Sequence, residues 1–181
     1  MRQSPAPLRP RAQKWREIND LYHKLLYWYY DRQNLAKARP IARRLERLLS
    51  EVTSDQPTIL GESAWALILE YKGDLLGAIK HRENDIQLMK RLLQISLKSP
   101  DPKAILKHYD YSDLSDRLDL LAILYHDAGN LEQALKVLRQ SQLLCEKRGI
   151  PFDGKSLLDD YLTEKDSTSR QPHKNSQKKA V

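Results

Sequence analysis

Three ionisable side chains, His81, Arg82 and Asp85, fall on the apolar side of a helix predicted over about 75–97. The other members of this apolar arc are Leu75, Ala78, Ile79, Ile86, Met89, Leu92 and Leu93. An unpaired charge in a protein core is costly, so we expect these three residues to pair with each other or with a neighbour. Helical spacing allows Arg82–Asp85 and His81–Asp85 contacts. The group is predicted to be a satisfied structural ion pair or a polar pocket facing a ligand, and the first is favoured.

Basic side chains mark one face of a second helix, predicted over about 35–52. They are Lys37, Arg39, Arg43, Arg44 and Arg47. Residues 1–50 hold 12 Lys and Arg against 4 Asp and Glu, a net +8, while the other 131 residues hold 19 against 20. Arginine forks suit phosphate oxygens, so this face is a candidate phosphate contact. The alternative, an ordinary solvated helix face, is favoured because charge runs are common on exposed helices.

The run Tyr27-Trp28-Tyr29-Tyr30 is the densest aromatic segment. Four consecutive residues span a full helical turn, so the rings cannot all point into one core. We therefore expect at least one exposed ring, and treat Tyr27, Trp28 and Tyr30 as candidate contacts to a partner or to nucleic-acid bases. The alternative, in which the rings fill the space between two hairpins, is somewhat favoured.

Other chemistry is not predicted. The sequence has no glycine-rich phosphate loop, no paired-histidine zinc helix and no serine on a strand-to-helix elbow, so we expect no catalytic residue, cofactor or metal. Cys145, the only cysteine, reads as a small apolar residue. Aspartates recur every three residues from Asp110 to Asp119. They could bind a metal ion, but we favour the interpretation that they stabilise the start of a helix through its dipole.

Composition argues against an all-β chain and against a membrane protein. The 181 residues are 40% apolar and 30% charged, with a mean hydropathy of -0.68 and only six glycines, which argues against an all-β chain. No stretch is apolar enough for a secretory signal or a membrane span, so we expect a cytoplasmic protein without a membrane partner.

Helix and turn signals divide the chain into three hairpins and two tails. The predicted hairpins cover 13–52, 59–97 and 114–148, followed by a short capping helix over 156–162. We expect a disordered Pro/Arg-rich arm over 1–12 and a disordered basic tail over 163–181. The hairpin turns align as Gln33-Asn34-Leu35, Gly73-Asp74-Leu75 and Gly129-Asn130-Leu131, with an alanine four residues after each capping residue: Ala38, Ala78 and Ala134.

These turns and their flanking residues resemble the tetratricopeptide repeat. The third hairpin matches best, through Leu121-Ala122, Tyr125, Gly129-Asn130-Leu131, Ala134 and Leu138. The resemblance covers about 19–148 and implies an all-α domain over 13–162, whose three antiparallel hairpins form a short right-handed superhelix. The spacing between turns is 40 and then 56 residues, so an insertion is expected around 98–112, with a short helix near 102–108.

The resemblance also implies a function. Such arrays are usually non-catalytic protein–protein scaffolds that hold a peptide or helix of a partner in a groove. The positions that clamp a terminal carboxylate in one subtype carry no suitable donor in this chain: His23, Tyr27, Ala64, Asp116 and Leu120. The alternative function is nucleic-acid or polyanion binding through the basic first hairpin, and a weaker one is an enzyme or sensor using the polar pocket. The sequence specifies neither the partner nor the oligomeric state.

Overall fold

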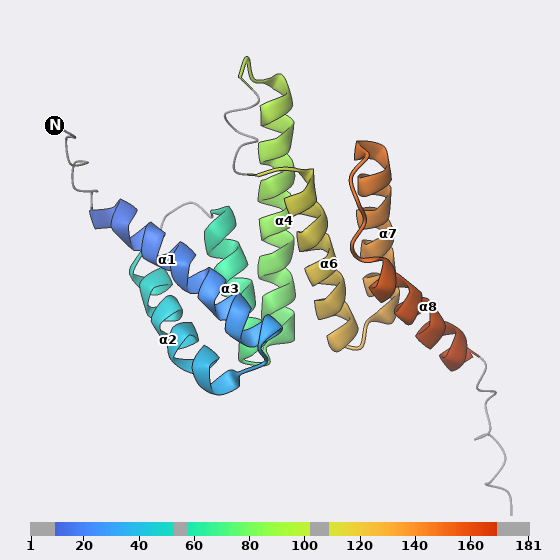
Figure 1. Cartoon of the computed structure of the whole chain (residues 1–181), viewed down its shortest axis with the longest axis horizontal. Helices are drawn as coiled ribbons and strands as arrows, with labels where there is room; N and C mark the ends of the chain where they lie inside the picture. The colour runs from blue at the N-terminus through green and yellow to red at the C-terminus, as the bar shows by residue number, and fades with distance from the viewer. Residues whose placement is uncertain (1–9, 53–57, 102–108, 170–181) are drawn as a thin grey trace, which may run out of the picture. The chain divides into compact units, whose positions relative to one another are not determined.

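The computed structural model describes residues 10–52, 58–101 and 109–169, and every regular element in these ranges is helical (Figure 1). The prediction of an all-α chain is therefore confirmed. The elements are α1 (Pro10–Leu26), the π-helical segment η1 (Tyr27–Asp31), α2 (Leu35–Glu51), α3 (Ile59–Tyr71), α4 (Leu75–Lys98), α6 (Tyr111–Asp127), α7 (Leu131–Arg148) and α8 (Lys155–Ser169).

The chain forms two compact units, one ending at Leu88 and the other beginning at Met89, so their boundary falls inside α4. In the first unit α1, α2 and α3 pack around one another (Figure 1). Their apolar residues recur at three- and four-residue spacing and so share one face of each helix. The core of this unit contains Ile18, Leu25, Ala38, Ala42, Leu45, Leu48, Leu49, Val52, Ala64, Leu67 and Ile68.

In the second unit, α6 and α7 form an antiparallel hairpin, and α8 packs on α7. Helix α6 begins with a capping box, in which the Asp110 side chain accepts backbone N–H bonds while the Asp113 side chain accepts the N–H of Asp110. The aspartates at this end thus serve the helix start, as predicted. At the far end of the hairpin, Gly149 takes a left-handed conformation (φ 65°) that closes α7.

The three predicted turns share one local geometry. The residue before each cap is left-handed: Gln33 (φ 46°), Gly73 (φ 81°) and Gly129 (φ 77°). Each capping side chain accepts the backbone N–H three residues later, at 3.1, 3.0 and 3.2 Å for Asn34, Asp74 and Asn130. The alanine four residues after each cap is fully buried, at Ala38, Ala78 and Ala134. The recurrence of the turn, inferred from sequence, is confirmed.

The first turn differs from the others by one residue. Asp74 and Asn130 each donate their backbone N–H to the carbonyl five residues earlier, whereas Asn34 reaches back six residues to Trp28. The extra residue is accommodated in η1, where the chain widens to a π-helix. Because each helical residue turns by about 100°, one added residue redirects the aromatic rings of this segment. Sequence reasoning did not predict this widening.

Two boundary predictions are wrong. Helix α1 begins at Pro10, so the predicted disordered arm over 1–12 is helical at 10–12; proline is well tolerated as the first residue of a helix. Helix α8 runs to Ser169, so the predicted capping helix over 156–162 is too short and residues 163–169 are not a disordered tail. The remaining arm and tail residues, and the helix predicted near 102–108, lie outside the described residues. Among those described, no helix is long and apolar enough to cross a membrane.

Candidate functional site

Arg82 and Asp85 form a fully buried ion pair in the first unit. Both side chains are 0% exposed, and Nη1 of Arg82 lies 3.2 Å from Oδ2 of Asp85. The hydroxyl of Ser63, on α3, donates to the same carboxylate oxygen at 2.6 Å. Burial opposes the charge of Arg82, but Tyr22, Asp85 and Tyr30 outweigh it and raise the pKa of the guanidinium. The guanidinium is therefore charged, and the predicted Arg82–Asp85 contact is confirmed.

Two N–H donor groups of the Arg82 guanidinium lack a hydrogen-bond acceptor among the described residues. Nε and Nη2 of Arg82 are buried without a hydrogen-bond partner among the described residues. A buried unsatisfied donor costs about 1–3 kcal/mol, so Arg82 lowers the stability that the surrounding apolar residues provide. Asp85 is the ion-pair partner of this buried charge, so we expect the stability of this unit to depend on its carboxylate.

His81 does not join this pair. Its Nδ1 lies 2.8 Å from Oε2 of Glu62, and its ring stacks beside Trp65 with 6.2 Å between ring centres. His81 thus pairs with a neighbouring helix, the other outcome that the sequence allowed. Asp85 is occupied in the interior by Ser63 and Arg82, while α3 supplies Glu62 at the partly exposed edge where His81 lies. Arg82 and Asp85 thus form an interior pair, while His81 pairs with Glu62 at a partly exposed edge.

Tyr30 belongs to a second buried polar contact. Its hydroxyl donates to the Glu70 carboxylate, with 2.5 and 2.6 Å to the two oxygens. Burial, followed by the charge of Glu70, raises the pKa of Tyr30 well above its usual range, so the phenol stays protonated. Glu70, 6% exposed, was missed by sequence reasoning, although its place at the end of the apolar run of α3 was a signal. Tyr30 therefore points to the interior in this structure.

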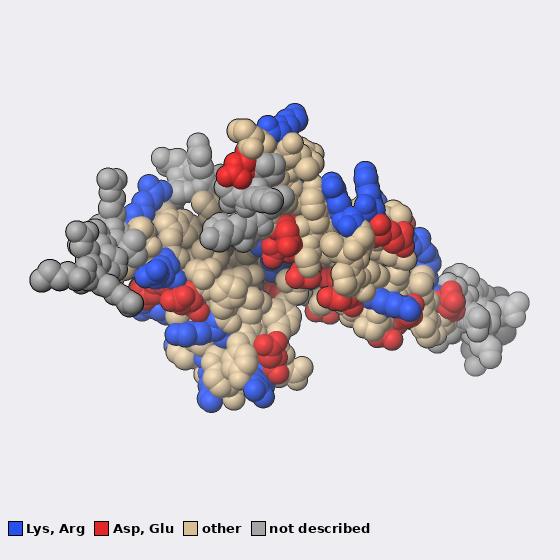
Figure 2. Space-filling model, turned by 45° about the horizontal axis from the view of Figure 1, so that its top comes forward, with Lys and Arg blue, Asp and Glu red and all other residues tan. Residues whose placement is uncertain are grey.

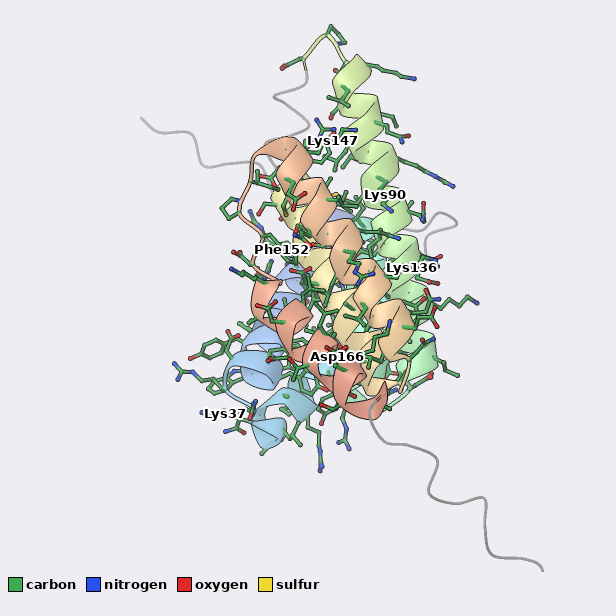
Figure 3. All side chains as sticks on the ribbon, turned by 90° about the vertical axis from the view of Figure 1, so that its right-hand side faces the viewer. Lys37, Lys90, Lys136, Lys147, Phe152 and Asp166 are labelled. Atoms are coloured by element: carbon green, nitrogen blue, oxygen red, sulfur yellow. The ribbon has the colours of Figure 1, made fainter. Side chains whose placement is uncertain are left out.

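Tyr27 is the exposed ring of the aromatic run, at 39%, which confirms that at least one ring faces solvent. Arg32 lies over its ring at 5.1 Å and donates to its hydroxyl at 2.7 Å. The half-buried Trp28 carries the ammonium of Lys37, labelled in Figure 3, 4.0 Å from its ring centre. One face of each ring is thus covered by a cation.

The predicted arginines of α2 are all exposed, but they are not equivalent. Arg44 pairs with Glu17 of α1 at 3.0 Å. Arg39, Arg43 and Arg47 have no ion pair within the described part of the chain. Basic and acidic side chains are interspersed over the face seen in Figure 2.

The second unit contains a small polar cluster between α6 and α7. The Ser115 hydroxyl lies 2.8 Å from that of Ser141 and 3.0 Å from the sulfur of Cys145, which is buried as predicted. Burial raises the pKa of Asp119 to about 6, and its Oδ1 has no hydrogen-bond partner among the described residues. No three His, Cys, Asp or Glu side chains in the described ranges are grouped to hold a metal ion.

His126 connects α6 to α8. Its ring stacks on Tyr161 with 4.2 Å between ring centres and 6° between planes, and its Nε2 lies 2.8 Å from Glu164. Its Nδ1 lies 3.5 Å from Asp127 of its own helix. The contact with Glu164, opposed by partial burial, raises the pKa of His126. Protonation of this ring should therefore strengthen the attachment of α8.

We expect α8 to be held more firmly at pH 6 than at pH 8.5. A histidine whose pKa is raised on folding gives its full stabilisation below its unfolded value, near 6.5, and loses it as the pH rises through the folded value. The carboxylates are about half exposed, so the contribution is below about 1 kcal/mol. Hydrogen exchange of α8 amides, corrected for the intrinsic pH effect, measures it. His126→Asn should remove the difference; a difference retained in full would contradict this assignment.

Comparison with known proteins does not assign this chain to a family. No protein-family model, curated protein or solved structure matches this chain. The resemblance to tetratricopeptide repeats therefore stays a prediction, and a function has to be argued from the residues. Two features carry that argument: the recurrent turn that joins the hairpins, and the exposed surface formed by η1 and α2.

Proposed function

We propose that this chain is a cytoplasmic, non-catalytic scaffold of the tetratricopeptide type. Its three antiparallel hairpins form a short right-handed superhelix, and a peptide or helix of another protein binds in the groove. The observation that supports this proposal is the repeated turn, in which a left-handed residue, a capping side chain and a fully buried alanine recur three times.

A buried alanine beside each turn allows the two helices of a hairpin to approach closely, because it adds almost no side-chain bulk. Units of this kind bury their apolar faces against neighbouring units and leave an extended surface for binding. A scaffold requires such a surface and no reactive group.

Tyr27 is the residue that we expect to anchor the partner. Its ring is exposed, and Arg32 restrains it from one side, so binding would order few additional rotamers. Exposed tyrosines that are already held in place are frequent energetic centres of protein interfaces. Tyr30, in contrast, is committed to Glu70 and is expected to contribute to stability instead.

The test is affinity capture with the full chain from nuclease-treated extract, followed by a binding measurement on the recovered partner. We expect one recurring protein whose direct binding is weakened at least about fivefold by Tyr27→Ala, the equivalent of about 1 kcal/mol. The matched control is Leu143→Ala, which truncates another exposed apolar side chain, on α7.

Two results would contradict the scaffold. One is recovery of no protein that binds the purified chain directly. The other is an equal loss with Tyr27→Ala and Leu143→Ala, which would show that the interaction is general adhesion to exposed apolar groups. Thermal unfolding of both variants has to match that of the native chain for the comparison to hold.

A further inference from the structure

Arg39, Arg43 and Arg47 form a row along the exposed side of α2. They are spaced four residues apart, so successive residues lie about 6 Å apart along the helix axis and share one face. The opposite face is buried in the core of the first unit through Ala38, Ala42, Leu45, Leu48 and Leu49. All three guanidinium groups are exposed to solvent. The row therefore lies on the exposed side of α2 and winds by about 40° from one arginine to the next.

The acidic residues of α2 do not neutralise this row. Glu46 pairs with Lys72, at 2.5 Å, and Glu51 pairs with Lys14 of α1, at 3.1 Å. Both carboxylates are thus occupied by cations from outside α2. Sequence analysis grouped Arg44 with the other arginines, but Arg44 pairs with Glu17 and is not part of the row. What remains is three neighbouring positive charges without an ion pair in the described part of the chain.

Such a row is not favourable for the helix itself. Like charges four residues apart destabilise a helix by a few tenths of a kcal/mol per pair, and this row contains two such pairs. A partner that presents several negative charges in line would remove that repulsion. Arginine meets phosphate oxygens with two parallel N–H donors, which favours a phosphate backbone over scattered carboxylates.

We propose that this row, Arg39–Arg43–Arg47, binds the phosphate backbone of double-stranded nucleic acid without reading its base sequence. Apart from the paired Arg44 and Glu51, the exposed residues beside the row are Ala36, Pro40 and Ser50, so no aromatic ring and no side-chain amide is present there to read adenine. The rings of Tyr27 and Trp28 each carry a cation on one face, which does not favour base stacking. This binding is independent of the scaffold proposed above.

Salt dependence tests the row directly. Binding of the full chain to a fluorescent DNA duplex of about 30 base pairs is measured by anisotropy between 50 and 200 mM salt. Each phosphate contact contributes about −0.9 to the slope of log K against log salt, so R39Q/R43Q/R47Q should reduce the slope by about 2 to 3. The charge-matched control R16Q/R91Q/R139Q removes three exposed arginines from other helices and should leave most of the slope.

The alternatives are outcomes of the same assay. Equal slope losses in the two triple variants would overturn the proposal, since only total charge would matter. Binding to polyglutamate, or to vesicles of phosphatidylserine and phosphatidylcholine, that matches or exceeds duplex binding at equal salt would also overturn it. Tyr27→Ala should leave duplex binding unchanged, so that loss of the protein partner and loss of the duplex are distinguishable.

Discussion

Asp85→Ala is expected to lower the free energy of unfolding of the first unit by about 3–5 kcal/mol. The substitution leaves Arg82, whose side chain is 0% exposed, with a charge that has lost its ion-pair partner. Ser63 loses its acceptor at the same time. Denaturant unfolding followed by tryptophan fluorescence measures the effect in this unit, because all three tryptophans, Trp15, Trp28 and Trp65, belong to it.

Two further variants make this result interpretable. Asp20→Ala removes an exposed carboxylate from the same unit and should change the unfolding free energy by less than about 0.5 kcal/mol. Arg82→Met combined with Asp85→Leu removes both charges and should recover most of the loss, because apolar replacements of a buried pair are often neutral or stabilising. A change of under 1 kcal/mol in Asp85→Ala would mean that water or another group compensates Arg82.

The double variant also separates a structural pair from a ligand pocket. If the pair only supports the fold, the folded double variant retains binding to any captured partner. If Arg82 faces a ligand through its two unsatisfied donors, the double variant folds but loses that binding. Burial of both side chains favours the first outcome.

The parts of this fold that sequence predicts well are those determined by neighbouring residues. Asn34, Asp74 and Asn130 cap their helices because a short polar side chain can reach its own backbone three residues on. The position of Arg82 and Asp85 in an apolar arc was enough to predict their pairing. In each case the interacting groups lie within one helical turn, so spacing alone constrains the geometry.

The parts that sequence missed depend on residues brought together by packing. Glu62 lies 19 residues before His81, and Glu70 lies 40 residues after Tyr30, so neither contact could be read from local spacing. The widening at η1, which places one more residue between α1 and its turn, was not predicted either. For the candidate surface, sequence found the arginines but could not show which of them were already paired.

Ala134→Leu is expected to lower the free energy of unfolding of the second unit by about 1–3 kcal/mol. Ala134 is 0% exposed near the start of α7, where α6 and α7 pack against each other. A leucine at this site adds three carbon atoms to a closely packed interface, and α7 must shift away from α6 to admit them. Thermal unfolding by circular dichroism, with hydrogen exchange of α6 and α7 amides, measures the effect.

Lys136→Leu is the matched control, because it adds a leucine to the same helix at an exposed position (Figure 3). It should leave amide protection in α6 and α7 unchanged. The result bears on the repeat as well as on one side chain. If buried alanines let the helices approach at every turn, Ala38→Leu should cause a comparable loss, detected by tryptophan fluorescence in the first unit. A loss at Ala134 without one at Ala38 would mean that the extra residue in η1 has relieved the close approach in the first hairpin.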